Sequence, residues 1–523
     1  LFGTLCVPPL PLQRESILPE GSRLTGKIIK SEKRKMEKTF KGVIAKINEF
    51  VGKPAYVWAV GALTLVVHML AIDMYSVVLY CLAMGFMAAF VDDYRGWLTI
   101  FVNTIFVVST QHSPGYGDNS NYLTQPQHLY PMIVAGVVAF AGIIYRVIKE
   151  RKNIKSGKSY LAFGITSFTF LIAGVGQQYY LQSLLANSIV VACLLGFYVI
   201  FVATVKNDGD LFEYIATLLA EVAFVAACQV AFVYVIRYDL FKSTIKEKGF
   251  SAWKGEIITG WGVSNIAGEL IAMFLPFAYY KAEKNKHVIF YWTIAIFSSL
   301  CIILTLSRTG IIAGGVIAIF FCIKTFVKRK ENRKSLALIF LIFLLGCVAA
   351  LAVIVRKTNI DVVAYIEKAF ASLGNMNLSK ISSGRIDHWK LRLKYFTERP
   401  IIGVGFCRRF MESNDGQAFY YSRYAHNYIF DAIGSAGIVG ILSMIAVIFL
   451  LIRLYIRKYE GRFYMVAFLA ANLFIGLLDI SYVMPYVLYL FALVTAVTEK
   501  LAYKNPEENQ LQTLKPLDGE ANE

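Results

Sequence analysis

The sequence predicts an all-α, polytopic integral membrane protein with about fourteen transmembrane helices and one large helical loop outside the membrane. Hydrophobic residues make up 57% of the 523-residue chain and charged residues only 17%, which is more apolar surface than a soluble protein of this size requires. Runs of roughly 18–25 residues with almost no charge recur, and this is the length that a helix needs to cross a bilayer. Lysines and arginines gather in short segments between these runs, which is typical of membrane topology signals.

The chain begins with a basic segment, residues 1–54, which we expect to be cytoplasmic and partly disordered. Residues 1–35 precede Met36 and lack the apolar core of a signal peptide, so we interpret them as an upstream or disordered extension. We then expect a transmembrane bundle of about eleven spans over 55–356, an extracytoplasmic loop with catalytic elements over 357–427, about three further spans over 428–498, and a polar cytoplasmic tail over 499–523. The expected spans are 55–72, 74–91, 97–111, 130–148, 159–176, 181–205, 211–236, 257–280, 287–306, 309–327, 336–356, 429–452, 463–479 and 482–498.

The charges between the spans indicate which loops face the cytoplasm. With the N-terminus inside, the strongly basic inside loops are 146–158, 281–286, 324–334 and 453–462. The outside segment 112–129 has no lysine or arginine. One exception is 237–256, which places Arg237, Lys242, Lys246, Lys248 and Lys254 outside. Either a span is miscounted or these cations act on the outer face, and we favour the second interpretation. The net charge of +18 therefore reflects topology and does not indicate nucleic-acid binding.

The long loop carries the stretch around which the chain is organised, from Gly384 to Gly440. Apolar residues recur at helical spacing after Arg385, and this predicts an amphipathic helix that ends before Pro400. Gly403 and Gly405 then permit a tight turn. Guanidinium groups, the His426 imidazole and an apolar floor suit a lipid-linked anion at a bilayer surface. The alternative is an ordinary interfacial helix with snorkelling arginines.

Other polar residues lie within or between the apolar runs. Arg308, in Ser307-Arg308-Thr309-Gly310, is on the outer side and either anchors the interface or faces a polar cavity. Glu221 and Glu269 lie inside spans and should face the bundle interior, more as structural hydrogen-bonding groups than as catalysts. The cysteines form no CxxC motif or disulfide framework. No outward Asp-x-Asp pair is present, so we predict no metal and no cofactor, with arginine supplying the positive charge.

The motifs together resemble the O-antigen ligase and polymerase superfamily. His426-Asn427, nine residues, Gly437, two residues and Gly440 are similar to its HN-x9-GxxG pattern. The segments from Gly384-Arg385 to Trp389 and from Arg399 to Gly405 look like that family's loop, and the Arg308 motif resembles its upstream arginine motif. The resemblance covers roughly residues 290–450. It implies a GT-C-like helical glycosyltransferase fold in a bacterial cytoplasmic (inner) membrane, with the active site on the extracytoplasmic side.

The resemblance also implies partners and roles. The donor would be a glycan linked to undecaprenyl diphosphate, the acceptor a hydroxyl-bearing glycan or glycolipid, and the lipid bilayer the surroundings. His426 would be the base, and Arg308 and Arg385 would hold the diphosphate. The candidates for substrate binding are Trp389, Arg392, Arg399 and Asn427. A single displacement would invert the anomeric configuration.

Three functions remain in competition at this point. A metal-independent glycosyltransferase of the ligase or polymerase type fits the outer loop best, and the two types are not separated. A polysaccharide flippase or transporter would instead need charged residues along a central path, for which Glu221 and Glu269 are the candidates. A non-catalytic glycan-binding subunit would have no need for His426.

Overall fold

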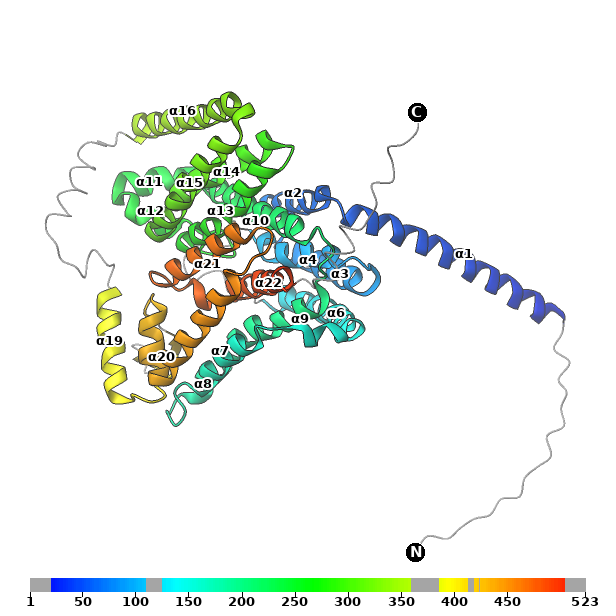
Figure 1. Ribbon diagram of the computed structural model, residues 1–523, viewed down its shortest axis with the longest axis horizontal. Coiled ribbons are helices and arrows are strands. Elements are labelled where there is room, and N and C mark those ends of the chain that lie inside the picture. The colour runs from blue at the N-terminus through cyan, green and yellow to red at the C-terminus, as the bar shows by residue number, and fades with distance from the viewer. Residues whose placement is uncertain (1–19, 110–124, 359–384, 413–417, 423, 504–523) are drawn as a thin grey trace, which may run out of the picture. The chain divides into compact units, whose positions relative to one another are not determined.

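The computed structural model describes residues 20–109, 125–358, 385–412, 418–422 and 424–503 (Figure 1). The chain divides into two compact units, Leu1–Phe50 and Val51–Glu523. The described part of the first unit is one helix, α1 (Glu20–Val51), on which exposed apolar residues such as Phe40 and Val43 are interspersed with lysines. The cytoplasmic location of 1–54 stays a prediction, and residues 1–19 lie outside the described residues.

The second unit is mainly helical, as expected where lipid offers the backbone no hydrogen-bond partners. Its helices before the long loop are α2 (Pro54–Leu70), α3 (Asp73–Phe90), α4 (Arg95–Asn103), α6 (Pro126–Lys149), α7 (Tyr160–Ile172), α8 (Tyr180–Val191), α9 (Phe197–Thr204), α10 (Leu211–Ile236), α11 (Tyr238–Lys248), α12 (Phe250–Glu256), α13 (Ser264–Lys284), α14 (Val288–Leu304), α15 (Arg308–Lys328) and α16 (Arg333–Thr358). The later helices are α19 (Arg385–Glu398), α20 (Tyr428–Tyr455), α21 (Arg462–Gly476) and α22 (Pro485–Ala502). Short 3₁₀ or π segments are η1 (Thr104–Val107), η3 (Arg151–Ser156), η4 (Ala192–Gly196), η5 (Lys330–Asn332) and η6 (Ser481–Val483).

The predicted spans agree with these helices in position but not all in length. Each predicted span overlaps one helix or a run of consecutive helical segments. Seven helices in the described part of the chain are long and apolar enough to cross a membrane, or eight if a bent pair counts as one more span. The shorter apolar helices are Arg95–Val107, Tyr160–Ile172, Val288–Leu304 and Arg462–Gly476. The chain is thus a polytopic helical membrane protein, and the exact number of fourteen spans remains a prediction.

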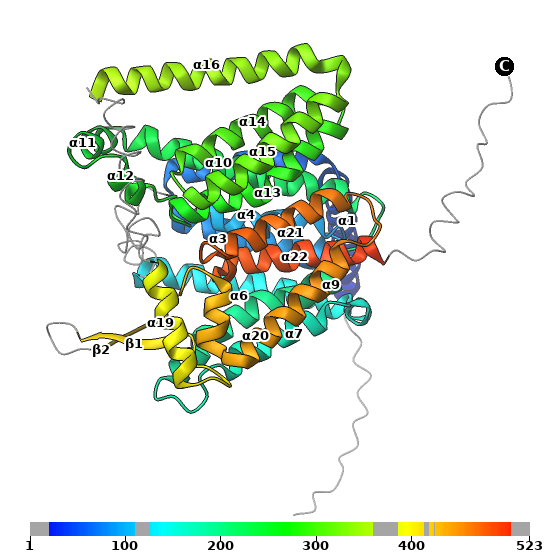
Figure 2. The same cartoon turned by 60° about the vertical axis from the view of Figure 1, so that its left-hand side comes forward.

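Helix α13 lies inside the second unit, with α10, α14, α15 and α21 packed around it (Figure 1 and Figure 2). Almost all its side chains are buried, and Glu269 is fully buried, as predicted. Two glycines let α13 and α15 approach closely: a Cβ built on Gly310 would lie 2.9 Å from the carbonyl carbon of Gly268. The first turn of α15, which contains Arg308, therefore lies at the level of Glu269.

Helix α20 is broken at Gly437, whose φ of 64° and ψ of −148° are accessible essentially only to glycine. The turn that follows α19 docks into this break. The Ile438 N–H donates to the Pro400 carbonyl at 2.7 Å, and the Gly405 N–H donates to the Ser435 carbonyl at 2.9 Å. The two glycine motifs of the sequence, from Arg399 to Gly405 and from Gly437 to Gly440, thus form one structural unit.

The loop between α16 and α20 contains a β-hairpin, whereas the sequence predicts only helices there. Where the loop is described, it consists of α19 and an antiparallel pair, β1 (Cys407–Glu412) and β2 (Ala418–Ser422). The all-α class therefore holds for the bundle, with this hairpin as an addition. Residues 359–384, including Gly384, lie outside the described residues, and the extracytoplasmic position of the loop stays a prediction.

Candidate active site

Asp479 connects the elements that form the candidate site. It is almost completely buried and follows the end of α21. His426 Nδ1 lies 2.8 Å from Asp479 Oδ1, and Arg385 Nη2 donates to Oδ2 at 2.9 Å. Asn265 Nδ2, at the start of α13, donates to Oδ2 at 2.7 Å, and the Ile480 N–H donates to Oδ1 at 2.9 Å. One carboxylate thus joins α13, α19 and the loop before α20.

The His426 ring is held by its backbone and by Asn427. His426 has a φ of +54°, which is uncommon for a residue other than glycine. Asn427 caps α20, since its Oδ1 accepts the Ile429 N–H at 2.9 Å and the Phe430 N–H at 3.2 Å. Its Nδ2 donates to the Leu477 carbonyl at 2.8 Å. Asn427 therefore fixes the start of α20 and ties it to the segment that carries Asp479.

The contact with Asp479 determines the chemistry available to His426. A carboxylate accepts hydrogen bonds, so neutral His426 carries its proton on Nδ1 and donates it to Asp479. Nε2 is then the ring nitrogen that can accept a proton. The side chain of His426 is 34% exposed, whereas that of Asp479 is 2% exposed. The pair thus consists of an accessible imidazole and a buried carboxylate.

The environment keeps Asp479 ionised. Burial by itself would raise the pKa of this carboxyl, but the hydrogen bond from His426 and the nearby charges of His426 and Arg385 outweigh burial, and the pKa is lowered. An ionised Asp479 orients the His426 imidazole and would stabilise it after it has taken up a proton.

Arg385 contacts this pair, and the charges of Asp479, Arg385 and Arg308 all act on Lys254. Arg385 contacts Asp479 directly, and Arg308 lies exposed at the start of α15, where the Ser307 hydroxyl caps the helix by accepting the Gly310 N–H at 3.1 Å. Lys254, on α12, is partly buried. Burial lowers the pKa of Lys254; the charge of Asp479 opposes this shift, and the charges of Arg308 and Arg385 add to it. Arg308, Arg385 and Lys254 therefore share one electrostatic environment.

Trp389 and Arg399, both predicted to bind substrate, make hydrogen bonds or stacking contacts within the protein. Trp389 Nε1 donates to the Ala425 carbonyl at 3.0 Å, and the Trp389 ring stacks on Phe430 with 5.0 Å between ring centres. Arg399 Nη1 donates to the Val175 carbonyl at 2.9 Å. These contacts hold α19 and the following turn against the bundle.

Arg392, also a predicted substrate-binding residue, forms a buried ion pair. Its Nε lies 2.9 Å from Asp431 Oδ1, and both side chains are almost fully buried. Asp431 also accepts the Ala425 N–H at 3.0 Å and a hydrogen bond from the Tyr482 hydroxyl. Arg392 thus supports the loop that ends at His426.

Asp479, Asn265 and Lys254 were not among the predicted site residues. Asp479 is the last residue of the predicted span 463–479, where a single acidic residue carries little sequence signal. Lys254 belongs to the basic segment 237–256, which did indicate cations on the outer face. Asn265 offers no signal of its own, because its role depends on a contact with a residue 214 positions away.

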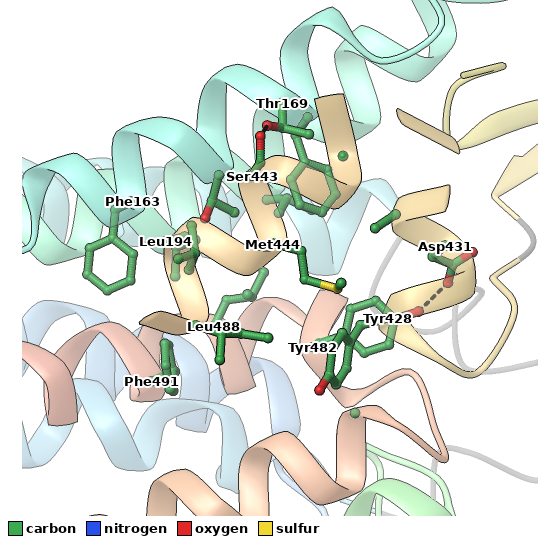
Figure 3. A pocket seen from close by; sticks show the side chains of 18 of the residues that line it. Phe163, Thr169, Leu194, Tyr428, Asp431, Ser443, Met444, Tyr482, Leu488 and Phe491 are labelled. Carbon is green, nitrogen blue, oxygen red and sulfur yellow. Dashed lines mark hydrogen bonds between the residues drawn. The ribbon is translucent and has the colours of Figure 1, made fainter. Parts of the chain in front are cut away.

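An apolar cavity of about 200 Å³ adjoins the site (Figure 3). Its walls come from α7, η4, α20, α21 and α22, with Phe163, Leu194, Met444 and Phe491 among the side chains. Asp431 and Tyr482 are the polar pair in the lining nearest the His426 loop. The cavity is therefore apolar along most of its length and polar beside the candidate site.

Within the described ranges, no group of three or more His, Cys, Asp or Glu side chains is arranged to hold a metal ion. The absence of a metal and a cofactor from the reaction remains a prediction.

Comparison with known families agrees with the motifs. Residues 293–445 match the family model described as O-antigen ligase. Comparison with curated proteins finds no match. The matched segment contains Arg308, Arg385 and His426, and it ends after Gly440. Residues 293–445 thus confirm the relationship to the O-antigen ligase and polymerase superfamily and support a ligase- or polymerase-like function in a membrane.

Proposed function

We propose that this protein is an integral membrane glycosyltransferase that moves or polymerises glycan from an undecaprenyl diphosphate carrier. The observation that carries the proposal is the His426–Asp479 pair, with Arg385 bound to Asp479 and with Lys254 close enough to feel the charges of Asp479, Arg385 and Arg308. A base, its carboxylate partner and a group of cations are what transfer from a diphosphate requires.

The reaction is a single displacement. Nε2 of His426 takes the proton of an acceptor hydroxyl as that oxygen bonds to the anomeric carbon of the donor sugar. The bond from the anomeric carbon to the diphosphate oxygen breaks, and its electron pair leaves with the carrier diphosphate. Asp479 stabilises the imidazolium that results. General-base catalysis of this kind contributes about 10²–10⁴-fold to a rate, and one displacement inverts the anomeric centre.

The cations stabilise the diphosphate leaving group. Forked hydrogen bonds from Arg385 and Arg308 match phosphate oxygens, and Lys254 adds a compact positive charge. Asp479 already occupies one side of Arg385, so this guanidinium is fixed in direction before substrate arrives. The charge that grows on the diphosphate is thereby neutralised without a metal ion.

The carrier and the acceptor approach from different surroundings. The apolar cavity beside Asp431 and Tyr482 suits the isoprenoid units next to the diphosphate. The acceptor is a hydroxyl-bearing glycan or glycolipid, which reaches His426 from water on the extracytoplasmic side of a bacterial cytoplasmic membrane. The same chemistry serves a ligase and a polymerase, which differ only in the acceptor.

The flippase alternative relies on the intramembrane acids Glu221 and Glu269, and the packing of Glu221 does not favour it. Glu221 accepts a hydrogen bond from Asn103 at 3.2 Å. A Cβ at Gly61 would lie 2.2 Å from Glu221 Oε1, so Gly61 leaves room for this carboxyl and for little else. The Glu221 carboxyl is thus packed against α2 at Gly61 and hydrogen-bonded to α4 at Asn103.

Turnover in proteoliposomes tests the proposal. The purified protein is supplied with a lipid-linked oligosaccharide and a hydroxyl acceptor, and products are resolved by size and mass. A glycosyltransferase yields longer or transferred glycan and free carrier diphosphate. A flippase moves the intact lipid-linked glycan across the bilayer without forming a new glycosidic bond, and this outcome would overturn the proposal.

A further inference from the structure

A second cavity, lined by charged residues, lies at the other end of the helices that build the candidate active site. Helices α13 and α15 begin at that site, with Asn265 and Arg308, and α21 ends beside it, just before Asp479. The new cavity is lined by residues from the opposite ends of the same helices, among them Lys284, Lys328 and Arg462. Helix α15 alone is about 30 Å long, which is the thickness of the apolar part of a bilayer. The two sites therefore lie at opposite ends of these helices, about one membrane thickness apart.

The cavity is large and rich in charge. Its volume is about 620 Å³, which falls in the usual range of small-ligand sites. Its basic lining residues are Lys284, Lys324, Lys328 and Arg462, and its acidic ones are Glu213, Glu283 and Glu460. Glu213 is already bound to Lys281, which lies outside the lining. The cations that face the cavity therefore outnumber the carboxylates that remain to balance them.

The excess of positive charge is concentrated around Glu283, a carboxylate that two lysines contact. This buried carboxylate pairs with two lysines, Lys324 at 2.7 Å and Lys328 at 2.8 Å, and accepts the Tyr464 hydroxyl at 2.6 Å. Two ammonium groups on one carboxylate leave a net positive charge. A phosphate group at this point would complete the balance and gain charge-assisted hydrogen bonds.

Lys324 is fixed in place before any ligand binds. Its Nζ donates to the Tyr464 hydroxyl at 2.7 Å and lies 4.3 Å from the centre of the Tyr464 ring and 4.6 Å from that of Phe463. Lys328 has a side chain that is 52% exposed and can turn towards a ligand. The site thus combines one preorganised cation with one adaptable cation.

The surface beside the cavity carries two exposed aromatic side chains. Phe320 is 51% exposed and Phe463 is 45% exposed, and their ring centres lie 5.6 Å apart. Phe463 belongs to the cavity lining as well. A ligand with a phosphate group in the cavity and acyl chains along these rings would satisfy both surfaces, whereas free phosphate would leave the apolar surface unused.

We propose that this cavity binds the phosphate of an anionic phospholipid headgroup, with the acyl chains lying over Phe320 and Phe463. Basic pockets between transmembrane helices on the cytoplasmic side are suited to such headgroups. The site would tie the ends of α13, α15 and α21 together at the face opposite the candidate active site. It does not depend on glycosyl transfer by that site.

The test uses the full chain in phosphatidylcholine nanodiscs, titrated with short-chain phosphatidylglycerol, with bound lipid counted by native mass spectrometry. Wild type should retain phosphatidylglycerol in a saturable manner. The double variant Lys324→Gln with Lys328→Gln should bind it about tenfold or more weakly, because two charge-assisted contacts are lost. The matched control is Lys330→Gln with Lys334→Gln, which removes the same charge from exposed lysines near the same helix ends and should bind like wild type.

Two further variants guard against loss of folding, because the lysine double variant leaves Glu283 buried without its partners. Glu283→Gln keeps both lysines and should bind phosphatidylglycerol at least as tightly as wild type. Lys284→Gln with Arg462→Gln changes only exposed cations of the rim and should weaken binding severalfold. Equal binding by the lysine double variant and the control would overturn the proposal. Inorganic phosphate that displaces phosphatidylglycerol at equal concentration would overturn the lipid assignment and leave a site for the free ion.

Discussion

The hydrogen bond between His426 and Asp479 fixes which nitrogen of the imidazole can accept a proton. Because Asp479 is buried and ionised, it would also favour the protonated ring that the proposed reaction forms. A histidine without this partner would have either tautomer available and would lose that stabilisation. At the scale of single residues, the pair is thus the feature on which the proposed chemistry depends most.

His426→Ala should lower turnover by about 10²-fold or more, since the general base is lost. Carrier-lipid binding and protein level should stay near wild type. In wild type the rate should fall as the pH falls, because a protonated imidazole cannot act as a base. His287→Ala, at the exposed start of α14, is the control and should keep normal turnover. A well-expressed His426→Ala protein with near-normal turnover would remove His426 from the mechanism.

Asp479→Asn should also lower turnover by about 10²-fold or more, because the amide neither holds the tautomer nor balances the imidazolium. Stability supplies an independent measurement. The pKa of Asp479 is lowered in the folded protein, so its stabilising contribution is present above about pH 4, the ordinary range of an aspartate, and is lost as the pH falls through the native value. Thermal unfolding of Asp479→Asn should lack this acid-dependent part. An unchanged acid dependence would mean that Asp479 is not held as described.

Arg308→Lys and Arg385→Lys should each reduce turnover by about tenfold or more, since an ammonium cannot form the forked contacts of a guanidinium. Arg151→Lys, exposed in η3, is the matched control. Activity should persist in EDTA if these arginines supply the charge. Complete loss in EDTA that magnesium restores would contradict a metal-independent reaction.

At the scale of elements, the break in α20 and the turn after α19 form the support of the site. The turn from Arg399 to Gly405 donates to and accepts from backbone groups that the break at Gly437 leaves unpaired. The Arg392–Asp431 ion pair and the Trp389–Phe430 stack join α19 to the same part of α20. Arg385, at the start of α19, and His426, just before α20, are therefore held by two helices that pack against each other.

Gly437→Ala should destabilise the protein by about 1–3 kcal/mol, because a Cβ at this φ is strained. It would also lie 2.4 Å from the Pro400 carbonyl oxygen. Turnover should fall with stability, since the turn can no longer dock. Gly315→Ala is the control: it has open space around it in α15 and should be neutral or slightly stabilising. Melting temperatures and turnover of both variants, measured side by side, check this expectation. Equal behaviour of the two variants would show that the break is not required.

The sequence predicted the helices well because a long uncharged run has few alternatives in a membrane. It did not predict the β1–β2 hairpin, although Asn414-Asp415-Gly416 between aromatic-rich runs is a typical hairpin signal. The motifs pointed to Arg308, Arg385 and His426, whose roles remain proposals. The motifs could not indicate Asp479 or Asn265, because a contact between residues far apart in the sequence leaves no local sequence pattern.

At the scale of the whole molecule, the orientation in the membrane decides which substrates each site meets. The helix directions place the candidate active site and the cavity around Glu283 at opposite ends of α13, α15 and α21. The basic loops 146–158 and 324–334 predict that the end with Glu283 is cytoplasmic. The candidate active site would then face outward, where a lipid-linked glycan meets its acceptor.

A cysteine at Lys394 tests this orientation, because Lys394 is exposed on α19, close in sequence to Arg385 and Arg392. With the native cysteines replaced, Lys394→Cys should react with a membrane-impermeant thiol reagent in intact cells. Arg151→Cys, exposed in a loop predicted to be cytoplasmic, should react only after lysis. Both positions are exposed and are predicted to lie on opposite sides of the membrane, so each variant is the control for the other. The opposite pattern would place the His426 site on the cytoplasmic face, and the extracytoplasmic acceptor would then have to be abandoned.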